Sequence, residues 1–319
     1  MLGSNLAEVL LASGHAVVAT RRETSRIDHL EDLAIEWKVA DLADTGGLAA
    51  AFDGCDGVFH CAAAVAVQYA VEDWIVDANV TGTQRVMDAV RTAGCGRLVH
   101  CSTVGAVGLS VDGEPCDEGQ TWNMPDYDLG DAYVTTKRQA EELVHEAIAG
   151  GFNAVIVNPT YMIGPRDVRP SSGKLVLDLM KGRAPGFTGG KNNFVDVRDV
   201  ARGMLLAMEK GKTGERYILG GRNMGYGEFM DIVSAVTGAK AVTRKVPDWA
   251  VRGLGLFGDL QHTVTGKDAI VNSATARWAI TPRFIFTSAK AQRDLGYTIS
   301  PLEPAVADCA AWFAAHDMT

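Results

Sequence analysis

Gly94-Cys-Gly-Arg-Leu-Val-His-Cys-Ser-Thr103 contains a short apolar run that follows two glycines and ends in two hydroxyl side chains. The run itself, Arg97–Cys101, has the length and apolar character of a strand that is buried on both faces, as in a parallel sheet. Ser102 and Thr103 therefore fall at the carboxyl end of that strand. Ligands of open α/β sheets bind outside the carboxyl ends of the strands, so a hydroxyl here can hydrogen-bond a bound molecule.

Similar apolar runs recur along the chain and alternate with helix-like segments, chiefly residues 72–92 and 132–149. This alternation is typical of a parallel sheet covered by helices on both faces. It predicts an α/β fold with a doubly wound, Rossmann-like sheet. The predicted strands are Ala16–Thr20, Ile35–Val39, Gly57–Cys61, Arg97–Cys101, Asn153–Val157 and Arg216–Leu219.

A tyrosine and a lysine, Tyr133 and Lys137, stand four residues apart at the start of the second predicted helix. Side chains at this spacing share one face of a helix, so the ammonium group is expected to lie beneath the phenol. A fixed cation favours the phenolate and lowers its pKa from about 10. General acid–base catalysis near neutral pH then becomes possible.

The tyrosine–lysine spacing alone is weak support, because it arises by chance in roughly one such chain in four. The alternative is a surface helix with an exposed Lys137 and a half-buried Tyr133. Thr103 favours the catalytic interpretation, since its hydroxyl at a strand end can hold a substrate carbonyl oxygen opposite the phenol.

The composition is that of a large folded domain, with 319 residues, 47% hydrophobic and 22% charged, and a formal net charge of −9. These values exclude the disordered and fibrous classes. The negative charge, with no basic cluster beyond Arg21-Arg22, predicts no nucleic-acid partner. No run of eighteen apolar residues occurs in the sequence, so we expect no membrane span and no membrane partner.

The six cysteines show no C-x-x-C pair and no histidine at zinc-finger spacing. This pattern predicts neither a metal site nor a disulfide framework. Such cysteines are typical of free thiols in a reducing compartment, and we therefore expect a cytoplasmic protein.

Taken together, the motifs of this chain resemble the extended short-chain dehydrogenase/reductase family, within the NAD-dependent epimerase/dehydratase superfamily, and most closely its dihydroflavonol-reductase-like branch. The resemblance runs over nearly all of the chain, and it is specific only as a set. The motifs that carry it are Asp41-Leu42, His60-Cys-Ala62-Ala63, Asn79-Val80-Thr-Gly82-Thr83, Ser102-Thr103, Tyr133 to Lys137, Asn158-Pro159-Thr160 through Gly164-Pro165, Asn193 to Gly203 and Arg216-Tyr-Ile-Leu-Gly220-Gly221.

The resemblance implies a division into two lobes. We expect residues 1–165 to form the dinucleotide-binding domain, with residues 186–221 returning to it. Residues 166–185 and 222–319 are expected to form a smaller, mostly helical substrate-binding lobe, because Gly, Pro, Arg and Asn interrupt the alternation after Pro165. Phe284–Phe286 and the residues after it match the family's terminal strand and helix.

The start of the chain, Met1-Leu2-Gly3-Ser4-Asn5-Leu6, resembles only the tail of the family's T-G-x-x-G-x-x-G loop. The family's first strand and two of its three glycines have no counterpart. A sheet that lacks a central strand leaves two rows of backbone groups unpaired, so we expect the native polypeptide to be longer.

The resemblance implies a bound nicotinamide dinucleotide and no metal. NAD-specific relatives place an acidic side chain after the second strand, whereas this chain has Thr20-Arg21-Arg22. Guanidinium groups pair bidentately with phosphate, which favours NADP(H) over NAD(H); the alternative is that both arginines are exposed loop charges. The other cofactor-binding residues that the resemblance implies are Leu2, Gly3, Asp41, Leu42, Ala62, Ala63, Lys137, Pro159, Thr160 and Met162.

The implied chemistry is hydride transfer to or from the carbonyl or alcohol carbon of a small molecule. In the reduction direction, Tyr133 would protonate the nascent alkoxide and Thr103 would hold its oxygen. Lys137 would lower the tyrosine pKa and hydrogen-bond the nicotinamide ribose. A hydrophobic or aromatic ketone or aldehyde is the expected substrate, and a homodimer through the helices around 79–91 and 133–146 is the family habit.

Two other functions remain open. Sugar-nucleotide epimerases and dehydratases with tightly bound NAD(P) use the same triad, but the motif Asn158-Pro-Thr-Tyr-Met-Ile-Gly-Pro165 is closer to the reductase branch. A non-catalytic NADP-binding sensor would typically lose Tyr133 or Lys137, and both are present. His60, His100 and His145 are interpreted as structural, and Asp196 and Asp199 as helix-capping residues.

Overall fold

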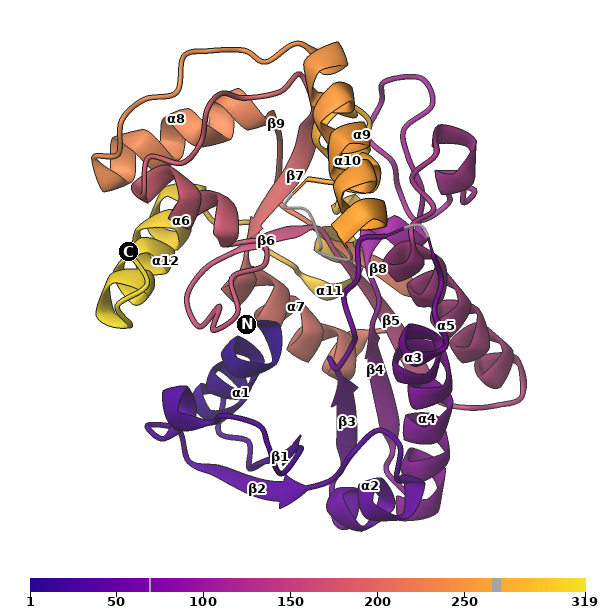
Figure 1. Ribbon diagram of the computed structural model, residues 1–319. Coiled ribbons are helices and arrows are strands. Elements are labelled where there is room, and N and C mark those ends of the chain that lie inside the picture. The colour runs from indigo at the N-terminus through magenta and orange to yellow at the C-terminus, as the bar shows by residue number, and fades with distance from the viewer. Residues whose placement is uncertain (69, 266–270) are drawn as a thin grey trace.

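The computed structural model describes residues 1–68, 70–265 and 271–319. Its centre is a parallel sheet in the order β3-β4-β5-β8, in which neighbouring strands stand in the registers His60↔His100, Val99↔Val155 and Val157↔Tyr217 (Figure 1). The strands are β3 (Gly57–His60), β4 (Arg97–Cys101), β5 (Ala154–Pro159) and β8 (Arg216–Leu219). All six residues of β5 are buried, as the apolar run Ala154–Val157 predicts for a strand covered on both faces.

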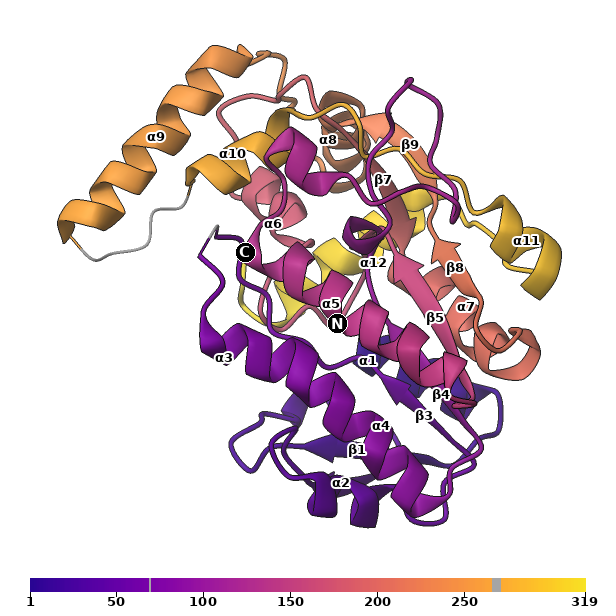
Figure 2. The ribbon, with the colours of Figure 1, turned by 90° about the vertical axis from the view of Figure 1, so that its right-hand side faces the viewer.

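Helices cover both faces of this sheet (Figures 1 and 2). One face carries α1 (Leu2–Ala12), α7 (Val197–Lys210) and α11 (Ala289–Leu295), and the other carries α3 (Asp73–Val76), α4 (Gly82–Ala93) and α5 (Ala132–Ala149). Leu98 and Val99 show how the layers arise: neighbours along β4 point to opposite faces, and each is fully buried in a different core cluster. Burying one such side chain stabilises the fold by about 1.5–3 kcal/mol.

Local sequence sets where the helices end. α4 ends at Gly94, whose backbone is left-handed (φ 71°), and its amide bonds back to the last turn of the helix. Glycine is the residue that adopts this conformation without strain, and the chain can therefore turn directly into β4. Asp196 caps α7 by accepting a hydrogen bond from the Arg198 amide, as its position in the sequence predicts.

The described residues also form two further sheets. β1 (Val17–Arg21) and β2 (Ile35–Val39) form a parallel pair beside α2 (Thr45–Phe52). β1 on the side away from β2, and β3 on the side away from β4, pair with no described strand. The six predicted strands thus fall into two separate sheets, β1-β2 and β3-β4-β5-β8.

A second core lies beside the main sheet. It contains the sheet β6 (Tyr161–Ile163), β7 (Lys191–Asp196) and β9 (Arg222–Gly225), with α6 (Lys174–Met180), α8 (Tyr226–Thr237) and α12 (Leu302–Ala315). The rings of Phe194 and Phe229 stack at its centre, with centroids 4.2 Å apart. The helices α9 (Asp248–Thr265) and α10 (Ser273–Ile280) pack against each other, and α9 projects outward in Figure 2.

The doubly wound α/β fold predicted from the sequence is confirmed, and the predicted strands coincide with observed strands to within one or two residues. The predicted helix over residues 72–92 is also confirmed, as a continuous helical segment of α3, a π-helical turn Asp77–Thr81 and α4. One detail was wrong. The predicted terminal strand Phe284–Phe286 makes only an isolated bridge, between Cys116 and Phe286.

The lobe expected in residues 166–185 and 222–319 is mostly helical, since its described elements are α6, α8 to α12 and the single strand β9. β7 falls within residues 186–221, whose return to the main domain was predicted, but its strand partners are β6 and β9. α7 and β8, from the same range, do pack on the main sheet. The roles assigned to the two lobes stay predictions.

Candidate active site

Thr103 lies immediately beyond β4, at the carboxyl edge of the four-stranded sheet. Its backbone is extended, and its Oγ1 caps the short helix η3 (Val104–Ala106) by accepting a hydrogen bond from the Gly105 amide at 3.3 Å. The Ser102 amide donates to the Val157 carbonyl oxygen at 2.8 Å, which continues the sheet pairing past the strand. Because Oγ1 serves the cap as an acceptor, its proton stays available to a substrate oxygen.

Tyr133 is the second residue of α5, and its phenol is close enough to the Thr103 hydroxyl to be affected by it. Burial raises the pKa of Tyr133 above the usual 10, Cys101 raises it further, and hydrogen bonding with Thr103 acts in the opposite direction. The phenol is therefore protonated at neutral pH. A protonated phenol is suited to donate its proton to an alkoxide.

The expectation that Lys137 lowers the pKa of Tyr133 is wrong for this structure. Lys137 is 2% exposed, and its Nζ donates to the carbonyl oxygen of Cys101 at 2.7 Å. The ammonium is thus engaged by the end of β4, and burial of the phenol dominates its pKa. Burial also lowers the pKa of Lys137 itself, whereas Cys101 and Glu141 raise it.

Two buried histidines lie below this group, with their ring centroids 5.5 Å apart. Burial, followed by the charge of Lys137, lowers the pKa of His60 to about 3 and also lowers the pKa of His100. Both rings are therefore neutral at physiological pH. His60 Nε2 lies 3.2 Å from Thr83 Oγ1, a contact that supports its structural interpretation.

Asn79 ties the chain after β3 to α5. Its Oδ1 accepts from the Ala64 amide at 2.7 Å, and its Nδ2 donates to the Ala64 carbonyl at 3.0 Å and to Thr136 Oγ1 at 3.0 Å. The sequence motif around Asn79 carried the family resemblance without an assigned role. The structure shows that this side chain holds the turn after β3 against the helix that bears Tyr133 and Lys137.

Comparison with known proteins places this site in a family. A sequence model of the NAD dependent epimerase/dehydratase family matches residues 1–220, which is more than half of the chain. The chain belongs to this family. It is an NAD(P)-dependent oxidoreductase of the extended short-chain dehydrogenase/reductase type.

The similarity extends over whole proteins of the epimerase/dehydratase family. A putative dihydroflavonol 4-reductase of Synechocystis sp. is 34% identical over 320 residues, or 99% of this chain and 92% of the relative. Sterol demethylase protein B of Methylococcus capsulatus is 33% identical over 331 residues, or 99% of this chain and 96% of the relative. The crystal structure of gox2253 has a TM-score of 0.84 and 34% identity, and the match covers 100% of this chain and 96% of that one.

The residues at the strand ends fit the dinucleotide that the epimerase/dehydratase family uses. Leu2 and Gly3 stand in the first turn of α1, and backbone amides in the first turn of a helix bind phosphate. A Cβ added at Gly3 would approach only the Cβ of Cys61, at 3.9 Å, so there is space beside this turn. After β5, the buried hydroxyl of Thr160 has no hydrogen-bond partner among the described residues, as expected of a group that meets a ligand.

The remaining predicted cofactor residues differ in how far their side chains are exposed. Ala62 and Ala63 are exposed after β3, and Pro159 is buried at the end of β5. Leu2 is 9% exposed and belongs to the core, against which Met162 also packs, so only the main chain of Leu2 can reach a cofactor.

The loops after the first two strands also carry predicted cofactor residues. Asp41 is exposed, and its Oδ1 accepts from the Ala43 amide, while Leu42 packs against the core. Arg22 is exposed, and Arg21 donates to the carbonyl oxygens of Arg22 and Glu23 at 3.4 and 3.3 Å. The structure therefore places all four side chains at the carboxyl ends of β1 and β2. Among the described residues, no group of three or more His, Cys, Asp or Glu is arranged to hold a metal ion, and no helix is long and apolar enough to cross a membrane.

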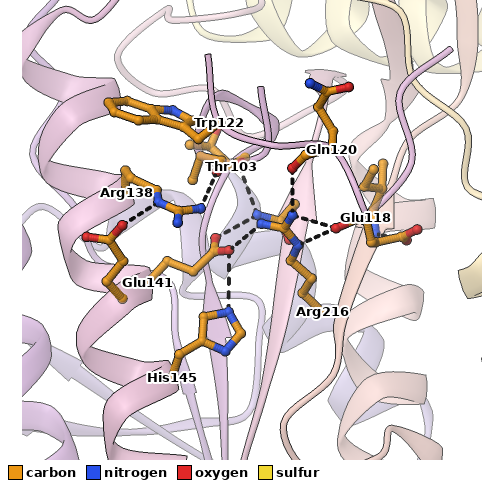
Figure 3. A network of polar contacts seen from close by, with 12 residues as sticks. Thr103, Glu118, Gln120, Trp122, Arg138, Glu141, His145 and Arg216 are labelled. Atoms are coloured by element: carbon orange, nitrogen blue, oxygen red, sulfur yellow. Dashed lines mark hydrogen bonds and ion pairs between the residues drawn. The ribbon is translucent and has the colours of Figure 1, made fainter. Parts of the chain in front are cut away.

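Three polar residues of the site received no role from the sequence: the buried Glu141 and Asn158 and the partly buried Arg216. Figure 3 shows Glu141 and Arg216 side by side. Glu141 is fully buried, and its two oxygens accept from Asn158 Nδ2 at 2.8 Å and Arg216 Nη1 at 3.1 Å. A signal was present, since Glu141 follows Lys137 at the same four-residue spacing that links Lys137 to Tyr133.

Asp131, the N-cap of α5, is predicted to make folding stability depend on pH. Burial raises its pKa from 3.8 to about 6, although it accepts from the Val134 amide and from Trp278 Nε1. Because folding raises this pKa, the protonated Asp131 stabilises the folded state below pH 3.8, and this stabilisation is lost as the pH rises through 6. The loss is roughly 3 kcal/mol, from a shift of about two units.

Asp131→Asn keeps an acceptor for the Val134 amide and cannot ionise. Its unfolding free energy, measured by urea titration, should rise relative to wild type by roughly 3 kcal/mol between pH 3.5 and pH 7. Asp126, an exposed residue of the preceding short helix η4 (Met124–Tyr127), serves as the control, and Asp126→Asn should show no such pH-dependent gain. A constant difference between Asp131→Asn and wild type at both pH values would contradict the prediction.

Proposed function

We propose that this protein is an NADPH-dependent carbonyl reductase of the dihydroflavonol-reductase-like type. The observation that carries the proposal is the grouping of Thr103, Tyr133 and Lys137 where β4 ends and α5 begins. A hydroxyl, a protonated phenol and a buried ammonium then lie on one side of the site, at the edge where parallel sheets bind ligands. The reductase names of the relatives point the same way.

In this mechanism the nicotinamide, when bound, supplies the hydride. Thr103 donates a hydrogen bond to the substrate carbonyl oxygen and holds it beside Tyr133. As negative charge develops on that oxygen, the phenol transfers its proton to it. Lys137, whose Nζ donates to the Cys101 carbonyl oxygen, would supply a positive charge at the end of β4 and a donor for the cofactor ribose. Burial of the phenol, which raises its pKa, keeps it protonated and favours the reduction direction.

NADPH is preferred because of Arg21 and Arg22, at the end of β1. The Nε of Arg21 is buried and has no hydrogen-bond partner among the described residues, while Arg22 is exposed. Two guanidinium groups at this strand end match the phosphate that distinguishes NADPH from NADH.

The double variant Arg21→Ala/Arg22→Ala is predicted to raise the KM for NADPH by roughly 100-fold, since each of two charge-assisted hydrogen bonds contributes at least about 1.5 kcal/mol. The KM for NADH should change by less than about twofold, because NADH lacks the phosphate. Arg26→Ala is the control, because Arg26 is exposed in the same loop and pairs with Asp28. Equal losses with both cofactors would refute the NADPH assignment.

An apolar substrate fits the surroundings of the triad. Trp122, Tyr127 and Trp278 are partly buried around the same core cluster as Tyr133. Such rings accommodate hydrophobic or aromatic ketones and aldehydes. The sterol demethylase relative is consistent with an apolar substrate class.

The deciding experiment is NADPH consumption measured against a broad library of ketones and aldehydes, with nucleotide sugars as a separate arm. Net NADPH oxidation with an apolar carbonyl supports the reductase. Turnover of a nucleotide sugar without net cofactor consumption would instead identify an epimerase or dehydratase, and cofactor binding without any turnover would identify a sensor.

A cytoplasmic location and a homodimer complete the proposal. All six cysteines are free thiols, as in a reducing compartment. The helices α4 and α5 would form the dimer interface. Gel filtration with light scattering would test the dimer, and fractionation of the native host cells would test the location.

A further inference from the structure

The loop that carries Thr103 is held by side chains from three directions. Asn158 Nδ2 donates to the Thr103 carbonyl oxygen at 2.9 Å, Trp122 Nε1 donates to the Gly105 carbonyl at 2.9 Å, and Arg138 Nη1 donates to the Ala106 carbonyl at 3.1 Å. The Thr103 carbonyl also accepts from the Ala106 amide at 3.0 Å. The backbone of η3 is therefore fixed on both sides of the Thr103 hydroxyl.

Glu141 is the residue on which two of these contacts depend (Figure 3). Its Oε2 accepts from the same Asn158 Nδ2 that donates to Thr103, so both protons of that amide nitrogen are used. Its Oε1 accepts from Arg216 Nη1, and Arg216 in turn donates to the Glu118 and Gln120 carbonyls. Gln120 lies two residues before Trp122, and Trp122 Nε1 donates to the Gly105 carbonyl in η3. The contacts of Arg216 therefore also lead to η3.

The carboxyl group of Glu141 is ionised. Burial alone would raise the pKa of Glu141, but His145, Ser102, Arg216 and Asn158 together lower it to about 2. The carboxylate is therefore ionised at neutral pH. Glu141 lies on α5, one turn after Lys137. It therefore connects the helix that carries Tyr133 to the loop that carries Thr103.

We infer that Glu141 is a positioning residue, which acts through Asn158 to hold the Thr103 hydroxyl in the place where it meets the substrate oxygen opposite Tyr133. This inference rests on the proposed function. Glu141 does not itself touch substrate or cofactor. Its carboxylate supplies two acceptors, and a neutral side chain of the same shape supplies only one, so Glu141→Gln must lose either the Asn158 or the Arg216 contact.

The test compares Glu141→Gln in two backgrounds, with Thr103 present and with Thr103→Val. Where Thr103 is present, kcat per NADPH-binding site should fall roughly 10- to 100-fold, the range expected when a reacting group is misplaced by about 1 Å. The Kd for NADPH should stay within about twofold. In the Thr103→Val background, Glu141→Gln should change kcat by less than about twofold, because the hydroxyl through which it acts is gone.

Glu146→Gln is the matched control, since it makes the same chemical change at an exposed position five residues further along α5 and should leave kcat unchanged. If Glu141→Gln does not fold, Asn158→Ala replaces it, because this variant leaves the Glu141–Arg216 pair in place and removes the hydrogen bonds from Asn158 Nδ2 to Thr103 and to Glu141. Equal loss of kcat in both Thr103 backgrounds would show that Glu141 supports the structure in general, and would overturn the inference.

A second readout separates this inference from the proposed function. Hydrogen exchange of the amides in residues 104–108, measured by mass spectrometry, should speed up in Glu141→Gln by roughly tenfold and remain unchanged in Glu146→Gln. If wild type reduces no carbonyl, the proposed function fails, and this exchange measurement alone decides whether Glu141 anchors the Thr103 loop. Unchanged exchange would reject the anchor.

Discussion

Tyr133→Phe is expected to lower kcat for carbonyl reduction by about 10²- to 10⁴-fold, the contribution of a positioned general acid. The substitution removes one oxygen, and the ring keeps its place at the start of α5. Because the phenol is protonated in the wild type, its loss removes the proton that the nascent alkoxide requires. The Kd for NADPH, measured by fluorescence quenching, should stay within about twofold, since the hydroxyl faces Thr103 and the substrate oxygen.

Tyr217→Phe provides the matched control for Tyr133→Phe. Tyr217 is fully buried in β8, and its hydroxyl accepts from the Lys212 amide at 3.3 Å, away from the site. Removing that oxygen should lower stability by about 1 kcal/mol and leave kcat unchanged. If Tyr133→Phe retained a tenth or more of wild-type kcat, Tyr133 would not be the acid, and the assignment of the triad would fall.

The main sheet could be predicted from the sequence because its signal is local. Arg97–Cys101 and Arg216–Leu219 are mostly apolar runs of strand length, and both were located correctly. The helix Ala132–Ala149 was also placed correctly, since Asp131 and Gly150 mark its two ends.

The small sheet β6-β7-β9 could not be predicted, because its stability comes from partners distant in sequence. β7 has the sequence Lys-Asn-Asn-Phe-Val-Asp, and its two asparagines read as loop residues. In the structure both are buried, and Asn193 is held by Gly221, Asn223 and Phe286. Tertiary hydrogen bonds thus override local propensity here.

The site shows the same division between local and distant information. Spacing alone placed Tyr133 and Lys137 on one helix, and the strand end placed Thr103 beside them. Spacing could not show the direction of the tyrosine pKa shift, because it depends on how much solvent reaches the phenol. Nor could it show that Glu141 binds Arg216, which lies 75 residues further along the chain.

Lys137→Met is the second substitution for which a large effect is expected. Its kcat should fall about 10²- to 10³-fold, as when one positioned donor is removed from an active site. The Kd for NADPH should rise about tenfold or more, through loss of a charged hydrogen-bond donor to the ribose. Lys174→Met, at an exposed lysine that pairs with Asp178, is the control and should leave both constants unchanged.

Stability should respond to Lys137→Met in the opposite sense from catalysis. Burial lowers the pKa of Lys137, which means that folding disfavours its charged form, and methionine removes that penalty. The melting temperature should therefore hold or rise while kcat collapses. The pKa of His60, about 3 in the wild type and lowered in part by the Lys137 charge, should rise in an NMR titration of the variant. A parallel loss of stability and activity would instead make Lys137 a structural residue. A catalytic cation whose burial costs desolvation energy does not stabilise the fold, and it is kept for its function.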